Sequence, residues 1–294
     1  MTGEPTYLFG VGATKAGTTW LYRYLAGHPD CHLRSVKELH YFDALEGGFD
    51  RQIKVNRDKV ARHAERLAGV AGGKAAQLRQ SLADLRDWLA VLDRRCEDLP
   101  AYRAYLETGR GTRRLVGDIT PAYSGLPVDR LQTMAALSGD VRFVYLLRDP
   151  LARFWSHVRM VASRSRAGQQ DLAGECARVF DRVLAGEPSD IANRSDYKGA
   201  LERLDAAVDP RRLLVMFMDQ LISLPGVARL CGFLGIGVHG ANVAARIHEG
   251  APLAMTSAQA ARARDWLAPQ YSYVAARFPE MPATWRASHD QGVA

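Results

Sequence analysis

The chain has 294 residues, 47% of them hydrophobic, and at this length we expect a single domain over residues 1–294 with one insertion. No stretch approaches the roughly 18 consecutive apolar residues of a membrane span, and the polar N-terminus lacks the pattern of a signal peptide, so we expect a cytoplasmic protein without a membrane span. The net charge of +7 favours an anionic ligand, but a basic run, zinc-finger spacing and an RNA-binding aromatic signature are missing, so we expect no nucleic-acid binding.

Strand-like and helix-like segments alternate along the chain. Apolar runs that predict strands cover residues 7–11, 115–119, 141–147 and 213–218. Helical patterns cover residues 18–26, 151–163, 175–186, 197–207, 225–234 and 257–277. Strands this apolar are typical of a parallel sheet covered on both faces. The alternation therefore predicts an α/β fold, a P-loop-like doubly wound parallel sheet flanked by helices.

Residues 51–97 do not fit this alternation. They are rich in Ala, Leu, Arg and Asp and are interrupted at Gly72 and Gly73, which predicts an inserted helical hairpin. Leucines of the second helix share one stripe, formed by Leu78, Leu82, Leu85, Leu89 and Leu92. We expect this stripe to pack on the first helix, through Val55, Val60, Ala64 and Leu67. The place of the hairpin, directly after a candidate catalytic segment, also suggests a lid or acceptor-recognition role.

The cysteines and the C-terminal tail carry little information. Four cysteines lie far apart without a C-x-x-C pair, so we expect ordinary buried thiols, no disulfide framework and no metal site. The tail after Trp285 is polar, and we expect it to be frayed.

The first strand runs into a glycine-containing turn, residues 12–17, that opens a helix. Unpaired N–H groups at such a helix start attract anions, which predicts a phosphate-binding loop. The spacing differs from that of an ATP-binding loop, because Thr18 stands where that loop has its lysine, and Lys15 comes earlier. This departure disfavours a P-loop kinase or NTPase. The glycines alone are explained equally well by a tight turn without a ligand.

A second candidate anion site follows the third strand. Arg148 stands at the strand end, and Pro150 suits the first turn of the next helix. Ser156 lies two turns along that helix, so its hydroxyl and the Arg148 guanidinium could converge on one phosphate. The alternative is a surface pair of Arg148 with Asp149 and a helix-capping serine.

The segment K-E-L-H-Y-F-D, residues 37–43, offers candidates for a general base. If it is extended, Glu38 and His40 share one face, and either could accept a proton. In the alternative without catalysis, Glu38 pairs with Lys37 at the surface.

Taken together, these motifs resemble the sulfotransferases that use 3′-phosphoadenosine 5′-phosphosulfate (PAPS). The string T-K-A-G-T-T-W at residues 14–20 is similar to their 5′-phosphosulfate loop, with the ending of the cytosolic members. The Arg-Asp-Pro strand end, with Ser eight residues after the Arg, resembles their 3′-phosphate motif. Residues 37–43 resemble the K-E-x-H-F-F-D segment of the heparan sulfate sulfotransferases and their bacterial relatives. The likeness covers most of residues 6–43 and 115–236.

The resemblance implies roles for individual residues. It implies a PAPS site made of Thr14, Lys15, Ala16, Gly17, Thr18, Thr19, Trp20, Arg148, Ser156 and Tyr197. In that site Lys15 contacts the sulfate and the bridging oxygen, and Trp20 stacks on the adenine. Tyr197 belongs to an S-x-Y-x-x-x-L helix and is as well explained by the core as by the ligand. The basic C-terminal loop of relatives is missing, and Arg246 and His248 are its candidate substitutes.

The resemblance also assigns the acceptor side. Glu38 is the implied base, His40 is the alternative, and Lys37 and Asp43 are acceptor-binding. Residues 117–123 resemble an E-K-T-P-x-Y segment, with Ile119 where a lysine often stands, and this adds Thr120 and Tyr123 as acceptor contacts.

We therefore expect a sulfotransferase that moves a sulfuryl group from PAPS to a hydroxyl or amine and releases 3′-phosphoadenosine 5′-phosphate, without a metal. A non-catalytic nucleotide-binding protein and a P-loop kinase are the alternatives. A saccharide, a lipid, a peptide tyrosine and a small phenol or amine stay open as acceptors, and so does a homo-oligomer.

Overall fold

The computed structural model describes residues 3–240 and 253–290. Within these ranges a five-stranded sheet has the order β2-β3-β1-β4-β5, and neighbouring strands are parallel. The strands are β1 (Thr6–Gly12), β2 (Cys31–His32), β3 (Leu115–Asp118), β4 (Val141–Leu147) and β5 (Leu213–Phe217). The predicted doubly wound parallel sheet is confirmed. The two-residue β2 is too short to leave a pattern in the sequence.

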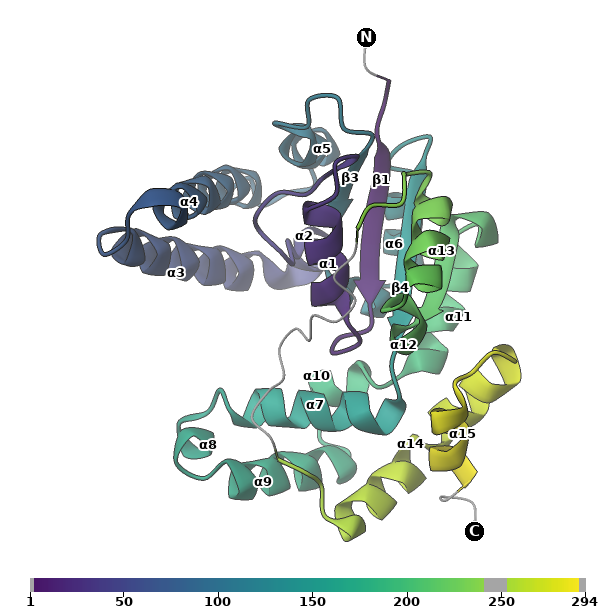
Figure 1. Ribbon diagram of the computed structural model, residues 1–294. Helices are drawn as coiled ribbons and strands as arrows, with labels where there is room; N and C mark the ends of the chain where they lie inside the picture. The colour runs from purple at the N-terminus through teal and green to yellow at the C-terminus, as the bar shows by residue number, and fades with distance from the viewer. Residues whose placement is uncertain (1–2, 241–252, 291–294) are drawn as a thin grey trace.

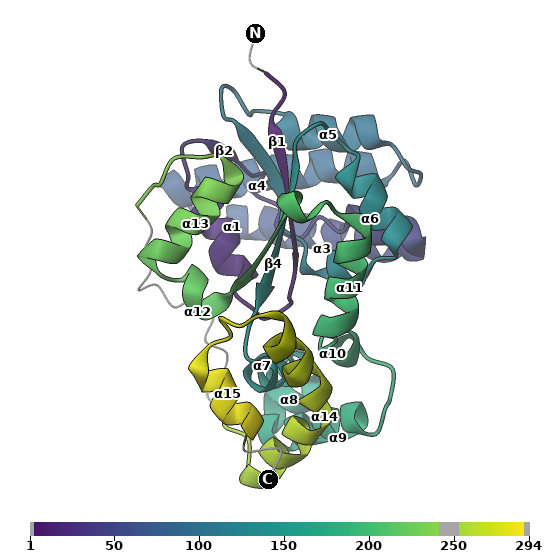
Figure 2. The ribbon, with the colours of Figure 1, turned by 90° about the vertical axis from the view of Figure 1, so that its right-hand side faces the viewer.

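Helices cover both faces of the sheet, which is why β1 and β4 are buried along almost their whole length. In Figures 1 and 2, α1 and α13 lie on one face, and α6 and α11 lie on the other. The helices between β1 and β4 are α1 (Thr18–Ala26), α2 (Tyr41–Asp43), α3 (Phe49–Leu67), α4 (Gly72–Leu92), α5 (Leu99–Glu107) and α6 (Val128–Ala135). A π-helix (Ala44–Gly48) and a 3₁₀-helix (Pro121–Gly125) complete this part.

The remaining helices follow β4. They are α7 (Pro150–Ala162), α8 (Arg166–Gln170), α9 (Leu172–Leu184), α10 (Asp190–Asn193), α11 (Tyr197–Ala207), α12 (Met218–Leu221), α13 (Leu224–Leu234), α14 (Ser257–Arg277) and α15 (Ala283–Asp290), with a 3₁₀-helix at Pro210–Arg212. Figure 1 shows α7, α9 and α14 beyond the carboxyl ends of the strands, at the edge where the loops after β1 and β4 meet. Parallel strands collect their following loops at this edge, where α/β folds bind ligands.

Helices α3 and α4 form the predicted hairpin, which projects from the body of the molecule (Figure 1). The leucine stripe of α4 is buried at Leu82, Leu85 and Leu92. Beside this stripe, Trp88 is fully buried, with its ring centroid 4.8 Å from that of Tyr105 on α5. The hairpin therefore contributes to the main core.

The expected packing partners on the first helix of the hairpin were partly wrong. Val55 is 38% exposed and Ala64 is exposed as well. The residues that α3 buries are Gln52, Ile53 and Asn56. The physical reason is that much of the α4 stripe packs on the aromatic core beside α5, so α3 covers it only in part.

Two further expectations needed correction. The tail does not fray directly after Trp285, because α15 continues to Asp290 and the Trp285 ring packs edge-on against Phe217 of β5. Three cysteines are buried as expected, but Cys96, in the turn after α4, is exposed. In the described residues, no helix is long and apolar enough to cross a membrane.

Candidate functional site

The loop after β1 is shaped to bring backbone N–H groups to a ligand. Gly17 has φ 92°, and a Cβ atom there would lie 2.9 Å from Cγ of Met218, so both the backbone conformation and the space require glycine. At Gly12 a Cβ atom would meet the Tyr145 ring at 2.4 Å. Helix α1 begins directly after Gly17 and no described side chain caps it. Its first N–H groups are therefore free for an anion.

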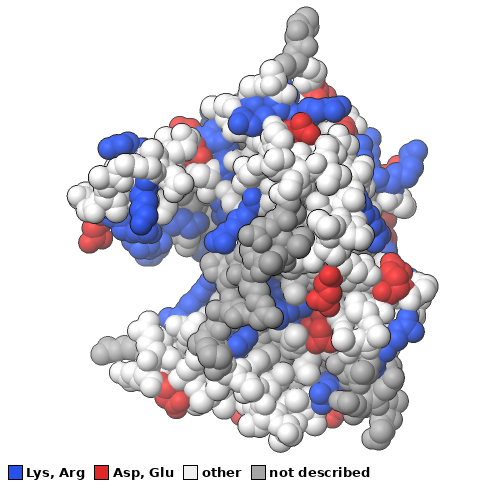
Figure 3. Space-filling model, in the orientation of Figure 1, with Lys and Arg blue, Asp and Glu red and all other residues white. Residues whose placement is uncertain are grey.

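Cations converge on this loop. Nη1 of Arg148, at the end of β4, donates a hydrogen bond of 3.1 Å to the carbonyl oxygen of Lys15. Burial lowers the pKa of Lys15, and the charges of Arg148, Arg164 and Arg159 lower it further, while Glu38 acts in the opposite direction. A group of like charges held this close is suited to a ligand with several negative charges. Figure 3 shows the molecule hollowed between the hairpin and the helices beyond the strand ends, with Lys and Arg bordering the hollow.

Two buried side chains hold the Arg148 strand end. The Tyr197 hydroxyl donates a hydrogen bond of 2.7 Å to the Arg148 carbonyl, and the tyrosine is fully buried, so it positions the strand end from the core. Asp149 caps α7 by accepting from Ala152 N–H at 2.8 Å, and it also accepts from the Tyr271 hydroxyl at 2.8 Å. Asp149 therefore caps α7 and bonds to Tyr271, and the expected surface pair of Asp149 with Arg148 does not form among the described residues. Ser156 lies half-buried on α7.

The structure adds an arginine that the sequence motifs did not indicate. Nη1 of Arg194, between α10 and α11, donates a hydrogen bond of 3.0 Å to Oγ1 of Thr14 in the loop. No motif places Arg194 at a fixed spacing from the loop, so the only signal in the sequence is that Arg194 directly precedes the S-x-Y motif.

Burial and the nearby Arg153 and Arg194 charges lower the pKa of His157 to about 2, so this histidine is neutral.

The expected stacking of Trp20 on an adenine has little room. Trp20 is 5% exposed and its ring stacks on Tyr24, which leaves little of the ring accessible.

Glu38, His40 and Asp43 come together, but not in the expected extended conformation. Glu38 and His40 both have left-handed backbone conformations, with φ 61° and 56°. Such strained residues are concentrated at functional sites. Nε2 of His40 lies 3.9 Å from Oε2 of Glu38, and its Nδ1 lies 2.7 Å from Oδ2 of Asp43. The segment therefore forms one compact polar group.

Glu38 also forms an ion pair with Lys37, as the non-catalytic alternative supposed. Its side chain is 43% exposed. Burial would raise the pKa of the carboxyl, but the charges of Lys37, His40 and Lys59 outweigh burial and lower it. Lys59 belongs to α3 of the hairpin, so a charge of the hairpin acts on the segment that carries Glu38.

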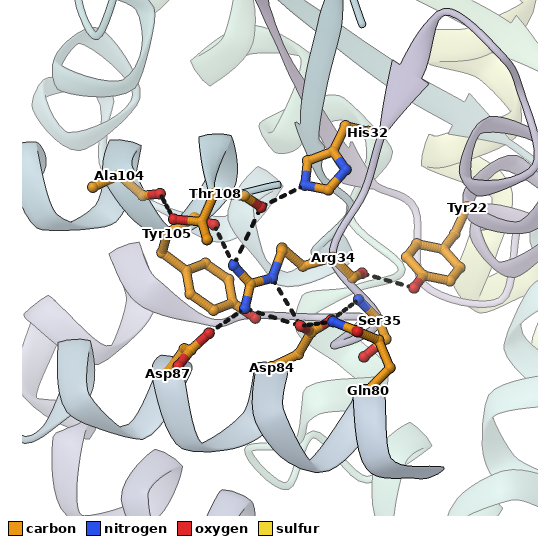
Figure 4. A network of polar contacts seen from close by, with 10 residues as sticks. All are labelled: Tyr22, His32, Arg34, Ser35, Gln80, Asp84, Asp87, Ala104, Tyr105 and Thr108. Carbon is orange, nitrogen blue, oxygen red and sulfur yellow. Dashed lines mark hydrogen bonds and ion pairs between the residues drawn. The ribbon is translucent and has the colours of Figure 1, made fainter. Parts of the chain in front are cut away.

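A buried ion pair fixes the start of this segment (Figure 4). Nη2 of Arg34 lies 2.9 Å from Oδ1 of Asp84 and 2.5 Å from Oδ2 of Asp87, both on α4. Oδ2 of Asp84 accepts a hydrogen bond of 2.7 Å from Ser35 N–H. Helix α4 thus anchors the chain two residues before Lys37.

Thr120 and Tyr123 require a correction, because the structure gives them a supporting position instead of an acceptor contact. Both are 0% exposed. Oγ1 of Thr120 and the Tyr123 hydroxyl donate to the buried carboxyl of Asp118 at 2.6 and 2.7 Å, and the Tyr123 hydroxyl accepts from Tyr41 N–H at 2.9 Å. The reason is that a buried carboxyl needs hydrogen-bond donors. Arg246 and His248 lie outside the described residues.

Comparisons with known proteins show which folds and which family this chain is similar to. A search of curated proteins finds no match. Among solved structures, a sulfotransferase from Alicyclobacillus acidocaldarius is similar over 97% of this chain and 99% of its own, with a TM-score of 0.60 and 19% identity. The sulfotransferase domain of the Synechococcus PCC 7002 olefin synthase is similar over 79% of this chain and 74% of its own, with a TM-score of 0.49 and 20% identity.

A family model extends the comparison from fold to family. It describes the Sulfotransferase family and matches residues 5–239. This range contains the loop after β1, the segment at Glu38 and the Arg148 strand end, all of which border one edge of the sheet. On this match, the chain belongs to the sulfotransferase family.

Proposed function

We propose that this sulfotransferase takes its sulfuryl group from PAPS and transfers it to a hydroxyl or amine, with Glu38 as general base and Lys15 on the leaving side. The observation that carries the proposal is that Lys15 lies among cations at the end of β1, where Nη1 of Arg148 donates a hydrogen bond of 3.1 Å to the Lys15 carbonyl oxygen. The pKa of Lys15 is lowered by burial and by the neighbouring arginines, and the Glu38 carboxylate, on the segment after β2, opposes this shift. An in-line transfer requires a base on the acceptor side and a cation on the leaving side, and Glu38 and Lys15 can supply them.

The donor side is the loop after β1 with the surrounding cations. PAPS carries a 5′-phosphosulfate and a 3′-phosphate, which supply the negative charge that this cluster lacks. The uncapped start of α1, at Thr18 and Thr19, offers N–H groups to the 5′-phosphate. Arg148 uses one donor on the Lys15 carbonyl, and the rest of its guanidinium is available to the 3′-phosphate, with the Ser156 hydroxyl as a partner on α7.

On the acceptor side, Glu38 removes the proton. The acceptor oxygen or nitrogen forms a bond to sulfur while the bond from sulfur to the bridging 5′-phosphate oxygen breaks. The proton of the attacking group passes to the Glu38 carboxylate, and Lys15 stabilises the negative charge that develops on the bridging oxygen. His40, hydrogen-bonded to Asp43, is the alternative base.

Two substitutions test the donor side. Lys15→Ala should reduce the turnover of ³⁵S-labelled PAPS by orders of magnitude, with affinity for 3′-phosphoadenosine 5′-phosphate within about tenfold, because the lysine acts mainly on charge that develops in the transition state. Arg148→Ala should weaken binding of that nucleotide by roughly 2–4 kcal/mol and remove its advantage over adenosine 5′-phosphate, because a charge-assisted contact is lost. Calorimetry measures both affinities, and a ³⁵S assay against fractions of a cell extract measures transfer.

Arg178→Ala is the matched control for Arg148, because Arg178 lies on the surface of α9 and pairs there with Glu175 at 2.9 Å. It should leave both nucleotide affinities unchanged. Equal loss of affinity for the two nucleotides in Arg148→Ala would place Arg148 elsewhere. Substantial turnover by Lys15→Ala would remove this lysine from the mechanism.

A further inference from the structure

Helix α3 of the hairpin carries three cations on one face. Lys59, Arg62 and Arg66 follow one another at intervals of three and four residues, the spacing that places side chains on one side of a helix. From Lys59 to Arg66 the row runs about 10 Å along the helix axis, at 1.5 Å for each residue. His63, on the next face, points to α4, where its Nδ1 atom lies 3.3 Å from Oγ of Ser81.

This row has no carboxylate of its own. Of the acidic residues on α3, Asp50 pairs with Arg95 at 2.7 Å and Asp58 with Lys54 at 3.9 Å, and Glu65 forms no ion pair with Arg62 or Arg66 within 4.0 Å. In the described part of the chain, Lys59, Arg62 and Arg66 have no carboxylate within 4.0 Å. A charged row without partners gains nothing for the fold, but it suits a ligand that brings negative charge.

The row begins at the catalytic segment. Burial lowers the pKa of Lys59; the Glu38 charge opposes this shift, and Arg62 and Lys37 add to it. Lys59 is half-buried at this point, whereas Arg62 and Arg66 are exposed farther out. The three cations therefore extend from the candidate base toward the tip of the hairpin.

We infer that Lys59, Arg62 and Arg66 bind the anionic groups of an extended, soluble acceptor and hold it so that its nucleophile reaches Glu38. The inference rests on the proposed function and narrows the acceptor to a polyanion that carries carboxylate, sulfate or phosphate groups. Figure 3 shows Lys and Arg on the side of the hairpin that borders the hollow. A flexible chain can enter such a hollow, whereas the flat surface of a membrane cannot follow the row to Glu38.

The test uses the full chain saturated with 3′-phosphoadenosine 5′-phosphate, so that the nucleotide site is closed to other anions. The probes are fluorescein-labelled oligosaccharides of equal length: dextran sulfate, carboxymethyl-dextran and unmodified dextran. Fluorescence anisotropy should show binding of the two anionic chains and none of the neutral one. The double variant R62A/R66A should weaken that binding at least about tenfold, because two charge-assisted contacts are lost.

The control variant K54A/R57A removes the same charge from the same helix. Lys54 and Arg57 have carboxylate partners in Asp58 and Asp93, so this variant should change the affinity less than about twofold. Both variants should keep their affinity for the nucleotide, and a wild-type chain that binds no nucleotide would count against the proposed function instead. Equal weakening by the two variants, or equal binding of neutral dextran, would overturn the inference. So would Arg62- and Arg66-dependent binding of phosphatidylserine vesicles without binding of the anionic dextrans.

Discussion

Glu38 shows how immediate neighbours set the chemistry of one carboxyl group. It forms an ion pair with Lys37 and lies 3.9 Å from His40, and together with Lys59 these neighbours hold its pKa below the ordinary value despite burial. A base that stays ionised at neutral pH is always ready to accept a proton, although its low basicity limits the driving force. A bound acceptor would remove water from the Glu38 carboxyl, and this desolvation would raise the pKa of Glu38 and make it a stronger base.

The pH dependence of turnover distinguishes the two candidate bases. Because the pKa of Glu38 is lowered from 4.5, its carboxylate persists at acid pH, and kcat/KM should stay level from neutral pH down to about pH 5. Glu38→Gln should abolish transfer and preserve nucleotide affinity, while His40→Ala should be the milder change. The control is Glu46→Gln, a nearby exposed glutamate that pairs with Arg130 at 2.9 Å. The reverse order of severity, with His40→Ala the more damaging change, would assign the base to the histidine.

At the scale of elements, α4 fixes the position of the chain just before the candidate catalytic segment, residues 37–43. Arg34 and Asp84 have side chains only 6% and 3% exposed, and the Arg34 guanidinium carbon lies 4.5 Å above the centre of the Tyr105 ring (Figure 4). Removing one partner of a buried ion pair leaves the other charge without compensation. This contact therefore ties the stability of the hairpin to the position of Lys37 and Glu38.

Arg34→Leu should lower the free energy of unfolding by about 3–5 kcal/mol, because Asp84 would remain buried without its guanidinium. Urea denaturation followed by tryptophan fluorescence measures the change. The double variant R34L/D84L should recover much of the loss. The control Arg57→Leu, which breaks an exposed pair with Asp93, should cost less than about 1 kcal/mol. Similar losses in the two single variants would show that the Arg34 pair does not anchor the hairpin.

Asp84 should also make stability depend on pH. Burial would raise the pKa of Asp84, but hydrogen bonds from Ser35 and the charge of Arg34 outweigh burial and lower it from 3.8. Folding therefore favours the carboxylate, and its contribution to stability is complete above the unfolded pKa, near ~4, and is lost as pH falls through the folded value. Asp84→Asn should flatten the stability curve below pH ~4. An unchanged acid dependence in that variant would assign the acid sensitivity to other carboxyl groups.

For the whole molecule, the hairpin cannot be treated as an appendage. The Trp88 ring on α4 packs within 6.0 Å of Tyr41 and 6.2 Å of Tyr102, measured between ring centroids, and it is fully buried. Tyr41 follows His40 directly, and its N–H group donates a hydrogen bond to the Tyr123 hydroxyl. The hairpin therefore packs in one unit with the core and with the segment that carries Glu38 and His40.

Replacing residues 51–97 by a short Gly/Ser linker tests whether the hairpin is only a lid, because nucleotide binding would then survive the deletion. The packing of Trp88 argues against that outcome, because the deletion exposes the aromatic core and removes Asp84. We expect the deletion variant to lose its cooperative thermal transition and its nucleotide binding together. Trp88→Ala should cost about 3–5 kcal/mol on its own. A deletion variant that folds and binds nucleotide with unchanged affinity would show that the hairpin is dispensable for the core.

The sequence by itself determined the sheet and the glycine turn after β1, because both depend on local patterns. Apolar runs mark β1 and β4, glycines mark the turn before α1, and the parallel order follows from the alternation of elements. The position of Arg148 directly after β4 was predicted from a local pattern as well, the apolar run that ends at Leu147. Each of these features can be recognised within a short stretch of chain.

Only the tertiary structure decided which side chains meet. Thr120 and Tyr123 have the motif of an acceptor site, but they turn into the core because Asp118 is buried there and needs donors. Arg194 reaches Thr14 from 180 residues away, and Lys59 approaches Glu38 because α4 holds the hairpin against the body. Burial and charge pairing depend on the elements that fold together, and the spacing of residues within one segment does not specify them.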